Sequence, residues 1–472
     1  MLPPAPGDWA AGPRARATGR GAGAEASRRE REMGVLPSPA RRRALRMLFA
    51  AATVLALAAT AAGPAAASPG RLMPQVVSVG SHYDSDPDFT GFAAEMAYCA
   101  GAKSTTPDIH TYEWTPFQDN FQAYLEGTWP EGSEGTPETV ATWFGGHRMQ
   151  YFAGHGLLTP IPTVWRQIEH NYSPAMQELS TGPDGQLYFV PQFTYPWVVL
   201  YNTSVFAAHG YTVPTTFDEF LALAGRMQSD GLVPLAFGDA DGWEAMGLFD
   251  ILDMRLNGFD FHMGLMNGAQ SWTDARVKAV FEQLRDLLPL ASPDPLSRSW
   301  RDGAAELADG TAGMYFLGTF ASWAIDPSVM PDIDMFAFPV FGNAYDAEAA
   351  IDAPVDGLAM TTNTTNLSAA QRLLACAGSP AAQLQFLAYD SGYIAAAKTA
   401  DTSSYTPFQQ RMASVIASAG HIAQFMDRDM RPDFAGPGGM QTFLTDFLAN
   451  PDQDLDAFLA GIQTAWDALP PE

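Results

Sequence analysis

Residues 184–220 read DGQLYFVPQFTYPWVVLYNTSVFAAHGYTVPTTFDEF, and they contain a predicted strand followed by a predicted helix. The apolar and aromatic run at 195–201 is typical of a buried strand, and Asn202 marks a turn after it. Thr216 and Glu219 have the spacing of a capping box, which predicts that a helix begins at Phe217. A strand that leads into a helix in this way indicates an α/β protein.

The alternation of strands and helices continues on both sides of this stretch. Further predicted strands lie at 75–80, 109–114, 138–144 and 232–237. Predicted helices lie at 275–288, at 368–387 and across much of the last 60 residues. The pattern predicts a mostly parallel sheet with helices on its faces. No fixed-period repeat and no low-complexity linker interrupts residues 75–472, so two interleaved α/β lobes fit better than two consecutive domains.

The charge of the chain argues against nucleic acid as a partner. The 472 residues carry a formal net charge of −26, although the first 67 residues contain ten arginines and only four acidic residues. Residues 68–472 therefore carry −32, a charge that repels phosphate backbones and anionic membranes. Apolar residues make up 47% of the chain, which is enough for a packed globular protein.

The amino terminus has the pattern of an export signal. Basic residues at 41–46 precede an apolar segment at 48–62, and small residues at 65–67 provide a cleavage site. The apolar segment is shorter than the roughly 20 residues that cross a bilayer. We therefore expect residues 1–67 to lie outside the fold, and the protein to be exported to the periplasm, to the cell surface or into the medium. No cysteine near the cleavage site offers an attachment point for a lipid.

Seven motifs occur in an order that resembles the extracellular solute-binding proteins of carbohydrate ABC importers, the maltose-binding-like family. They are Pro137 to Phe144 with Gly145-Gly146 and Gly156-Leu157-Leu158, Asp184 to Pro191, Tyr201-Asn202 with Phe206, Pro214 to Phe220, Gly313-Met314-Tyr315 with Gly318-Thr319-Phe320, Asp356-Gly357, and Ser379-Pro380. The sequence departs from the family pattern at two positions. Glu138 stands in the segment that usually reads Pro-Asp-Val, and Phe320 stands where tryptophan is usual. The sequence also lacks the family's lipid-attachment cysteine.

The resemblance implies a periplasmic-binding-protein-like type II fold, in which two interleaved α/β lobes close on a ligand around a hinge. By motif order, residues 75–194 with 341–393 form one lobe, and 195–340 with 394–472 form the other. The resemblance also implies capture of a mono- or oligosaccharide and its delivery to the membrane permease of an ABC importer. We expect a monomer that uses no cofactor and binds no nucleic acid.

The chain has two cysteines, Cys99 and Cys376. They form no metal-binding motif, and the residues alone leave open whether they are two buried thiols or one disulfide. In the lobes that the resemblance implies, both cysteines fall in the same lobe. A bridge there would stiffen that lobe without preventing closure.

Candidate ligand-binding residues are aromatic side chains that lie near acidic or basic ones at the ends of predicted strands and helices. A sugar presents C–H faces that stack on aromatic rings, and hydroxyl groups that charged side chains bind strongly. The candidates are Tyr83, Asp84, Trp143, Arg148, Tyr195, Trp197, Trp243, Thr319, Phe320, Trp323, Asp356, Gly357, Asp427 and Arg428.

Several candidates also have a purely structural interpretation. Tyr83 and Asp84 can belong to a turn before a helix, and Trp143 can be a core residue. The charged run at 427–431 can be an ion-pair network or a solvated face. The sequence leaves these alternatives open.

The sequence gives no motif for catalysis. It contains no G-x-S-x-G, H-E-x-x-H or P-loop, and His147 and His155 lack the i, i+4 spacing of a metal pair. Asp427 and Asp429 could suggest a glycosidase, but an acid-rich chain produces such pairs by chance. We therefore predict a binding protein without catalytic residues or metal. A binder of a polyol or another small solute, or a ligand-presenting partner of a sensor, is an alternative, and a secreted glycoside hydrolase is less favoured.

Overall fold

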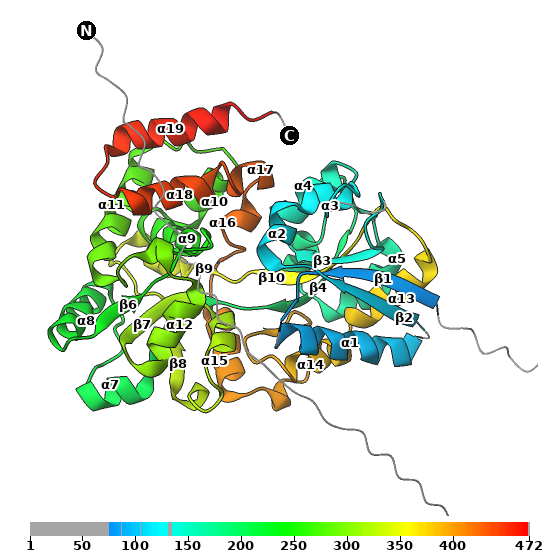
Figure 1. The fold of residues 1–472 in the computed structure, drawn as a ribbon, viewed down its shortest axis with the longest axis horizontal. Helices are drawn as coiled ribbons and strands as arrows, with labels where there is room; N and C mark the ends of the chain where they lie inside the picture. Colours follow the sequence, from blue (N-terminus) through cyan, green and yellow to red (C-terminus); the bar gives the residue numbers. More distant parts are fainter. Residues whose placement is uncertain (1–74, 86, 104, 131–134, 471–472) are drawn as a thin grey trace, which may run out of the picture. The chain divides into compact units, whose positions relative to one another are not determined.

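The computed structural model describes residues 75–470, except 86, 104 and 131–134, and Figure 1 shows how their helices and strands are arranged. The predicted export signal at 1–67 lies outside the described residues. The chain divides into the units Met1–Pro69 and Gly70–Glu472, and every element described below belongs to the second unit.

Two larger sheets and one short strand pair carry the fold. The first sheet has the strand order β11-β4-β10-β3-β1-β2. Its strands are β1 (Gln75–Ser81), β2 (Thr105–Thr111), β3 (Val140–Phe144), β4 (Phe189–Thr194), β10 (Val355–Met360) and β11 (Ile394–Ala395). The second sheet, with the order β6-β7-β5-β8, consists of β5 (Trp197–Asn202), β6 (Val233–Ala236), β7 (Ala312–Gly318) and β8 (Ile333–Phe336). The short parallel pair is β9 (Ile351–Asp352) with β12 (Ile422–Ala423).

Both sheets are mixed, so the prediction of a mostly parallel sheet is wrong. In the first sheet β1 is parallel to β2 and β3, whereas β10 is antiparallel to β3 and β4. In the second sheet β5 is antiparallel to both β7 and β8. Strand β10 follows the strands of the second sheet in sequence and then returns to the first sheet. A pattern of apolar residues predicts a strand, but it does not predict whether that strand runs parallel or antiparallel to its neighbours.

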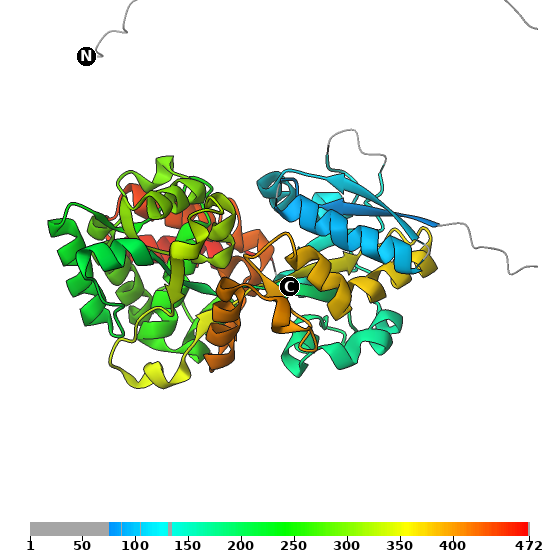
Figure 2. The same cartoon turned by 90° about the horizontal axis from the view of Figure 1, so that it is seen from below.

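Helices accompany each sheet. The first sheet and its helices, here called the first lobe, include α1 (Asp88–Lys103), α2 (Trp114–Asp119), α3 (Phe121–Leu125), α4 (His147–Gly154), α5 (Pro162–Ile168), α6 (Pro174–Leu179), α13 (Leu367–Ala377) and α14 (Pro380–Leu387). The second sheet and its helices, here called the second lobe, include α7 (Thr203–His209), α8 (Phe217–Ser229), α9 (Glu244–Asn257), α10 (Phe259–Met266), α11 (Ala275–Leu287), α12 (Trp300–Asp309), α17 (Pro432–Ala435), α18 (Met440–Ala449) and α19 (Leu455–Asp467). Figure 2 gives a second view of α1 beside α13 and α14, against which it packs.

The chain passes between the lobes more than once. It leaves the first sheet at Thr194 and enters the second at Trp197, and it returns to the first sheet with β10. Two later helices contact both lobes: α15 (Pro407–Ser418) packs on β8 and β11, and α16 (Met426–Asp429) packs on α4 and α9. Each lobe is therefore assembled from separate segments of the sequence.

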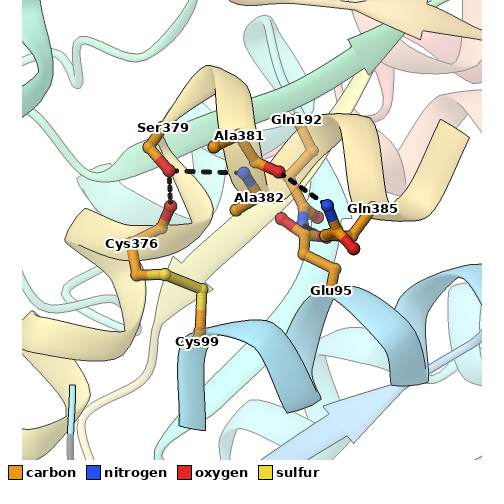
Figure 3. The surroundings of a disulfide bond; sticks show 8 residues. All are labelled: Glu95, Cys99, Gln192, Cys376, Ser379, Ala381, Ala382 and Gln385. Carbon is orange, nitrogen blue, oxygen red and sulfur yellow. Dashed lines mark hydrogen bonds between the residues drawn. A yellow bond between two sulfur atoms is a disulfide. The ribbon is translucent and has the colours of Figure 1, made fainter. Parts of the chain in front are cut away.

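A disulfide joins Cys99 in α1 to Cys376 in α13, with their Cα atoms 5.7 Å apart. Of the two alternatives that the sequence leaves open, the structure contains the bridge. Figure 3 shows it beside the start of α14, where the Ser379 hydroxyl accepts from the backbone N–H of Ala382 and donates to the carbonyl of Cys376. Both linked helices belong to the first lobe.

Local sequence signals agree with many of the elements. The capping box of Thr216 and Glu219 is present at the start of α8, and the strand expected at 75–80 is β1. Two expectations need correction. The strand expected at 109–114 begins earlier, as β2, and Trp114 already starts α2. The helix expected at 368–387 is divided into α13 and α14, because Pro380 follows Gly378 and Ser379 and starts a new helix.

Within the part of the chain that the structure describes, no helix is both long enough and apolar enough to cross a membrane.

Candidate ligand-binding cleft

A cleft with about 860 Å³ of empty volume, including solvent at its mouth, opens between elements of the two lobes. The first lobe contributes His82, Asp84, Ser85, Asp88, Trp114, Thr115 and Gln118. The second lobe contributes Trp197, Asp241, Trp243, Trp300, Arg301, Phe320 and Trp323. Tyr195, Pro354, Tyr393, Phe425, Asp427 and Arg428 come from segments that connect the lobes.

Aromatic rings line the second-lobe side of the cleft in an unbroken series. Phe320 lies at the centre of this series, with its ring centroid 5.9 Å from Trp243 and 5.4 Å from both Trp300 and Trp323. Trp323 in turn lies 5.2 Å from Tyr393. Trp243 and Trp323 are only partly buried, so part of each ring is free to contact a bound molecule.

The position of Phe320 follows from the local sequence. Strand β7 ends at Gly318, and the 3₁₀ helix η4 (Thr319–Ala324) follows it directly. A Cβ atom on Gly318 would lie 2.3 Å from the Phe320 ring, so glycine allows that ring to fold back on the strand end. Thr319 is fully buried, and its hydroxyl donates to the carbonyl of Gly392 at 2.8 Å.

Arg428 is the main cation of the cleft. Its Nη1 donates to Asp356 Oδ1 at 2.6 Å, and its Nη2 donates to the hydroxyl of Tyr195 at 2.9 Å. The guanidinium carbon lies 3.9 Å from the centre of the Phe144 ring, a cation–π contact. These three contacts fix the orientation of Arg428 before any ligand arrives.

Burial and Arg428 act in opposite directions on Asp356. The carboxyl is fully buried, and burial raises its pKa to about 6, although Arg428 partly opposes this shift. Arg428 itself has its pKa raised above the usual range, because Asp356 and other acidic neighbours outweigh the effect of its burial. The pair is therefore mostly ionised at pH 7.

A second ion pair holds the neighbouring carboxylate. Arg148 in α4 donates from Nη1 to Asp427 Oδ2 at 2.7 Å. The guanidinium of Arg148 also lies 5.1 Å from the centre of the Trp143 ring. Asp427 keeps some exposure in the cleft, and its Oδ1 has no hydrogen-bond partner among the described residues. That oxygen is buried and lies 3.6 Å from Arg428 Nε, so Asp427 also forms an ion pair with Arg428.

His82 supplies a neutral polar group at the first-lobe side. Burial, with Arg428 and Arg148 nearby, lowers its pKa well below the ordinary value, so the ring is uncharged at pH 7. The hydroxyl of Thr142 accepts from the backbone N–H of His82 and lies 3.0 Å from the ring Nδ1. The ring is thus held by Thr142 at Nδ1, while its buried Nε2 has no partner among the described residues.

Eight of the predicted ligand-binding residues line the cleft: Asp84, Tyr195, Trp197, Trp243, Phe320, Trp323, Asp427 and Arg428. The structure brings them together from both lobes. The other six lie outside this lining: Tyr83, Trp143, Arg148, Thr319, Asp356 and Gly357.

The residues outside the lining support it. Trp143 is fully buried and stacks on Phe121 at 3.4 Å, so the core interpretation describes its position. Tyr83 is buried against Phe92 and Phe386. Gly357 lies in β10, where a Cβ atom would come within 2.1 Å of the carbonyl oxygen of Val190, so glycine is needed for close strand packing.

Several lining residues were not among the predicted ones. They are His82, Ser85, Asp88, Trp114, Thr115, Gln118, Asp241, Trp300, Arg301, Pro354, Tyr393 and Phe425. Trp300 and Arg301 carry the same signal as the predicted residues, an aromatic beside a charge at a helix start, and the Ser299–Asp302 capping box marks that start. Trp114 was misplaced because it was expected to end a strand.

The chemistry of the cleft combines flat aromatic faces with carboxylate, amide and guanidinium groups. Such a site can stack the C–H face of a ring and hydrogen-bond to hydroxyl groups around its edge. No group of three or more His, Cys, Asp or Glu side chains in the described residues is arranged to hold a metal ion.

Comparisons with known proteins place this fold and cleft in context. The bacterial solute receptor AcbH, described as having an exclusive preference for β-D-galactopyranose, is 36% identical in sequence and superposes with a TM-score of 0.79. The match covers 83% of this chain and 98% of AcbH. The chain thus has the periplasmic-binding-protein-like α/β fold that the sequence predicts.

Two further relatives are known from sequence. An ABC transporter extracellular-binding protein of Pyrococcus horikoshii, PH1214, is 25% identical over 290 residues, 60% of this chain and 64% of that protein. The match thus spans slightly less than two thirds of the length of PH1214. The α-glucosides-binding periplasmic protein AglE of Rhizobium meliloti is 27% identical over 346 residues, 67% of this chain and 73% of AglE.

The sequence profile of the bacterial extracellular solute-binding proteins matches residues 106–384, more than half of the chain. Together with the fold and the interlobe cleft, this match means that the chain belongs to the bacterial extracellular solute-binding protein family.

Proposed function

We propose that this protein captures a carbohydrate outside the cytoplasm and delivers it to the membrane permease of an ABC importer. The observation that carries the proposal is the cleft itself, in which Trp243, Phe320 and Trp323 provide ring faces beside Asp427 and Arg428. Aromatic faces bind the C–H side of a sugar ring, and fixed charged groups bind its hydroxyls. The preorganised contacts of Arg428 reduce the entropy that binding must overcome.

The relatives support the same substrate class and suggest a first sugar to test. AcbH, which matches over nearly its whole length, prefers β-D-galactopyranose, and AglE binds α-glucosides. We infer a hexopyranose as the ligand, with D-galactose as the leading candidate. PH1214 is named as an ABC transporter protein, which supports the proposed permease partner.

The proposed mechanism is closure of the two lobes on the sugar. We propose that the lobes follow the expected division at 194/195, 340/341 and 393/394, except that β11 (Ile394–Ala395) pairs in the first sheet and extends the first lobe past residue 393. The crossing between Thr194 and Trp197 is then one hinge segment. A ligand shifts such an equilibrium only through contacts that it makes better in the closed form. Trp243 and Phe320 on one side and Asp84 on the other are the groups that a sugar would connect.

We propose that the protein acts as a monomer. We also propose that it is a binder and not a hydrolase, since all three relatives are named as receptors or binding proteins. The family to which the chain belongs is extracellular, which supports export. A ligand-presenting role toward a membrane sensor would use the same cleft and the same closure.

A thermal-shift screen tests the proposal with D-galactose, D-glucose, an α-glucoside, raffinose and a polyol. A ligand that binds only the folded state stabilises it by about 2.7 kcal/mol at about 100-fold over Kd. We expect galactose to raise the midpoint, and the sugar to be recovered unchanged after incubation. The Trp243→Ala variant should lose the shift, whereas the control Trp466→Phe, outside the cleft, should keep it. A shift with none of the sugars, or consumption of the sugar, would contradict the proposal.

A further inference from the structure

We propose that Asp250 and Asp429 are positioning residues of the cleft, because they hold the backbone of Phe425 in a strained conformation that directs the following segment into the cleft. Phe425 directly precedes α16. Three side chains of this segment line the cleft: Phe425, Asp427 and Arg428. Asp250 and Asp429 lie outside the lining, so they act on a ligand only through those side chains. This role rests on the proposed function only where sugar affinity is measured.

The strain lies at a single residue. Phe425 has a φ of 119° and a ψ of 144°. In the described part of the chain, the other non-glycine residues with positive φ are Asp294, Ala349 and Asn366, with values of 53°, 44° and 56°. Those values lie in or near the left-handed helical region, whereas the backbone of Phe425 lies close to a region that is occupied almost only by glycine. A bulky residue keeps such a conformation only where its surroundings force it to.

Two buried carboxyl groups hold the chain on either side of Phe425. The backbone N–H of Gln424 donates to Asp429 Oδ2 at 2.6 Å, and the backbone N–H of Met426 donates to Asp250 Oδ2 at 2.7 Å. The carbonyl of Phe425 itself accepts from two backbone N–H groups of α16, at 2.8 and 2.9 Å. Because both neighbours and its own carbonyl are fixed, Phe425 connects them in the strained conformation.

The anchors of this segment come from both lobes. Asp250 lies in α9 of the second lobe, and its Oδ1 lies 3.8 Å from Nε2 of the buried His262. From the first lobe, the backbone N–H of Val355 in β10 donates to Gln424 Oε1 at 3.0 Å. A Cβ atom on Gly146, just before α4, would lie 3.2 Å from Gln424 Cγ. The segment is therefore held tightly on two sides, as the persistence of strain requires.

The strained backbone places one ring and one cation of the cleft. The Phe425 ring stacks on Trp197, with ring centroids 4.8 Å apart and planes at 21°. Three residues later, Arg428 bonds to Asp356 and Tyr195. Without its anchors, Phe425 would relax to a negative φ, which turns the ring off Trp197. We expect Arg428 to shift with it, because both side chains extend from the same short segment.

A pair of substitutions at Phe425 tests the strain in ligand-free protein. Phe425→Ala and Phe425→Gly both remove the ring, but only glycine adopts a φ of 119° freely. We expect the thermal midpoint of Phe425→Gly to lie about 2 °C above that of Phe425→Ala. The matched control is the pair Met426→Ala and Met426→Gly in α16, where glycine should give the lower midpoint. A midpoint of Phe425→Gly equal to or below that of Phe425→Ala overturns the proposal.

Substitutions at Asp250 test the positioning role. Asp250→Ala removes the acceptor of the Met426 N–H, whereas Asp250→Asn keeps an oxygen in its place. The readout in ligand-free protein is the ¹H–¹⁵N signal of the Trp197 indole, assigned by its loss in Trp197→Phe. We expect Asp250→Ala and Asp429→Ala to move this signal toward its position in Phe425→Ala, and Asp250→Asn to leave it in place. The control Glu95→Ala, which removes another buried carboxyl group, should also leave it in place.

The Kd of D-galactose is measured in parallel. We expect it to rise at least about fivefold in Asp250→Ala and to change less than about twofold in Asp250→Asn. An indole signal that keeps its wild-type position in Asp250→Ala, or that moves equally in Asp250→Asn, overturns the positioning role. Displacement of the signal in Asp250→Ala alone, without galactose binding by any variant or by the wild type, supports the positioning role and refutes only the proposed ligand.

Discussion

Removal of Arg428 should destabilise the protein strongly and in a pH-dependent manner. The ion pair of Arg428 and Asp356 is buried, with 6% and 0% of the two side chains exposed. Arg428→Met leaves the fully buried carboxylate of Asp356 without a cation. Breaking a buried pair on one side costs about 3 to 5 kcal/mol. We expect a loss of this size in the free energy of unfolding at pH 8.

The pH dependence provides the sharper test. In the wild type the pKa of Asp356 is about 6, the result of burial and the opposing effect of Arg428. Without Arg428 that pKa rises further, so the carboxyl of the variant becomes neutral at acidic and neutral pH. Each pH unit between the two pKa values changes the stability difference by about 1.4 kcal/mol. The destabilisation should therefore shrink by up to about 2.7 kcal/mol between pH 8 and pH 6.

Urea unfolding of the ligand-free protein at both pH values measures the effect, with tryptophan fluorescence and circular dichroism as two probes. The double variant Asp356→Asn, Arg428→Met should be more stable at pH 8 than Arg428→Met alone, because it buries no unpaired charge. The control is Arg411→Met, which breaks a partly exposed ion pair with Asp334 and should cost less than about 1 kcal/mol. Equal losses at pH 6 and pH 8, or no loss at pH 8, would refute the reasoning.

Three further changes test other parts of the molecule. Trp243→Ala should weaken sugar binding by about 10- to 100-fold in calorimetry, since it removes a ring face from the cleft, and an unchanged Kd would remove Trp243 from the site. Burial lowers the pKa of His262, but the hydrogen bond with Asp253 and the charges of nearby carboxylates outweigh burial and raise this pKa to about 9. The stability that protonated His262 contributes should therefore be lost as pH rises through 9. His262→Asn should abolish that alkaline loss in a pH series of unfolding curves. Replacement of Cys99 and Cys376 by alanine should lower the free energy of unfolding by about 4 kcal/mol while the Kd stays unchanged, and a changed Kd would mean that the bridge affects the cleft.

Much of the fold could be predicted because its signals are local. The capping box at Thr216 and the apolar run at 195–201 depend on neighbouring residues, and α8 and β5 agree with them. The direction of β10 depends on how distant segments return to one sheet, and no local pattern contains that information. The division at Pro380 could have been predicted, because proline after glycine and serine is a helix start.

The cleft was harder to predict than the fold. Residues at the ends of elements, such as Trp243 and Phe320, could be selected because an aromatic near a charge or a glycine marks such places. Whether an aromatic faces the cleft or the core depends on tertiary packing. Trp143 is the penultimate residue of β3, close to two glycines, yet its ring stacks on Phe121 in the core. Tyr393 follows Gly392 and lies near Asp390, so it carries the same signal but was not selected, and it lines the cleft where the chain returns after α14.

The charges around the cleft explain how an acidic protein can bind a neutral solute. Residues 68–472 carry −32, yet two carboxylates at the centre of the cleft region are each paired with an arginine. Asp356 is paired with Arg428, and Asp427 is paired with Arg148. These ion pairs fix the direction of the hydrogen-bonding groups, and they also weaken the electrostatic field that a ligand meets in the cleft. In such a site the shape and the hydroxyl pattern of a ring decide affinity more than charge does, which is what selection among neutral sugars requires.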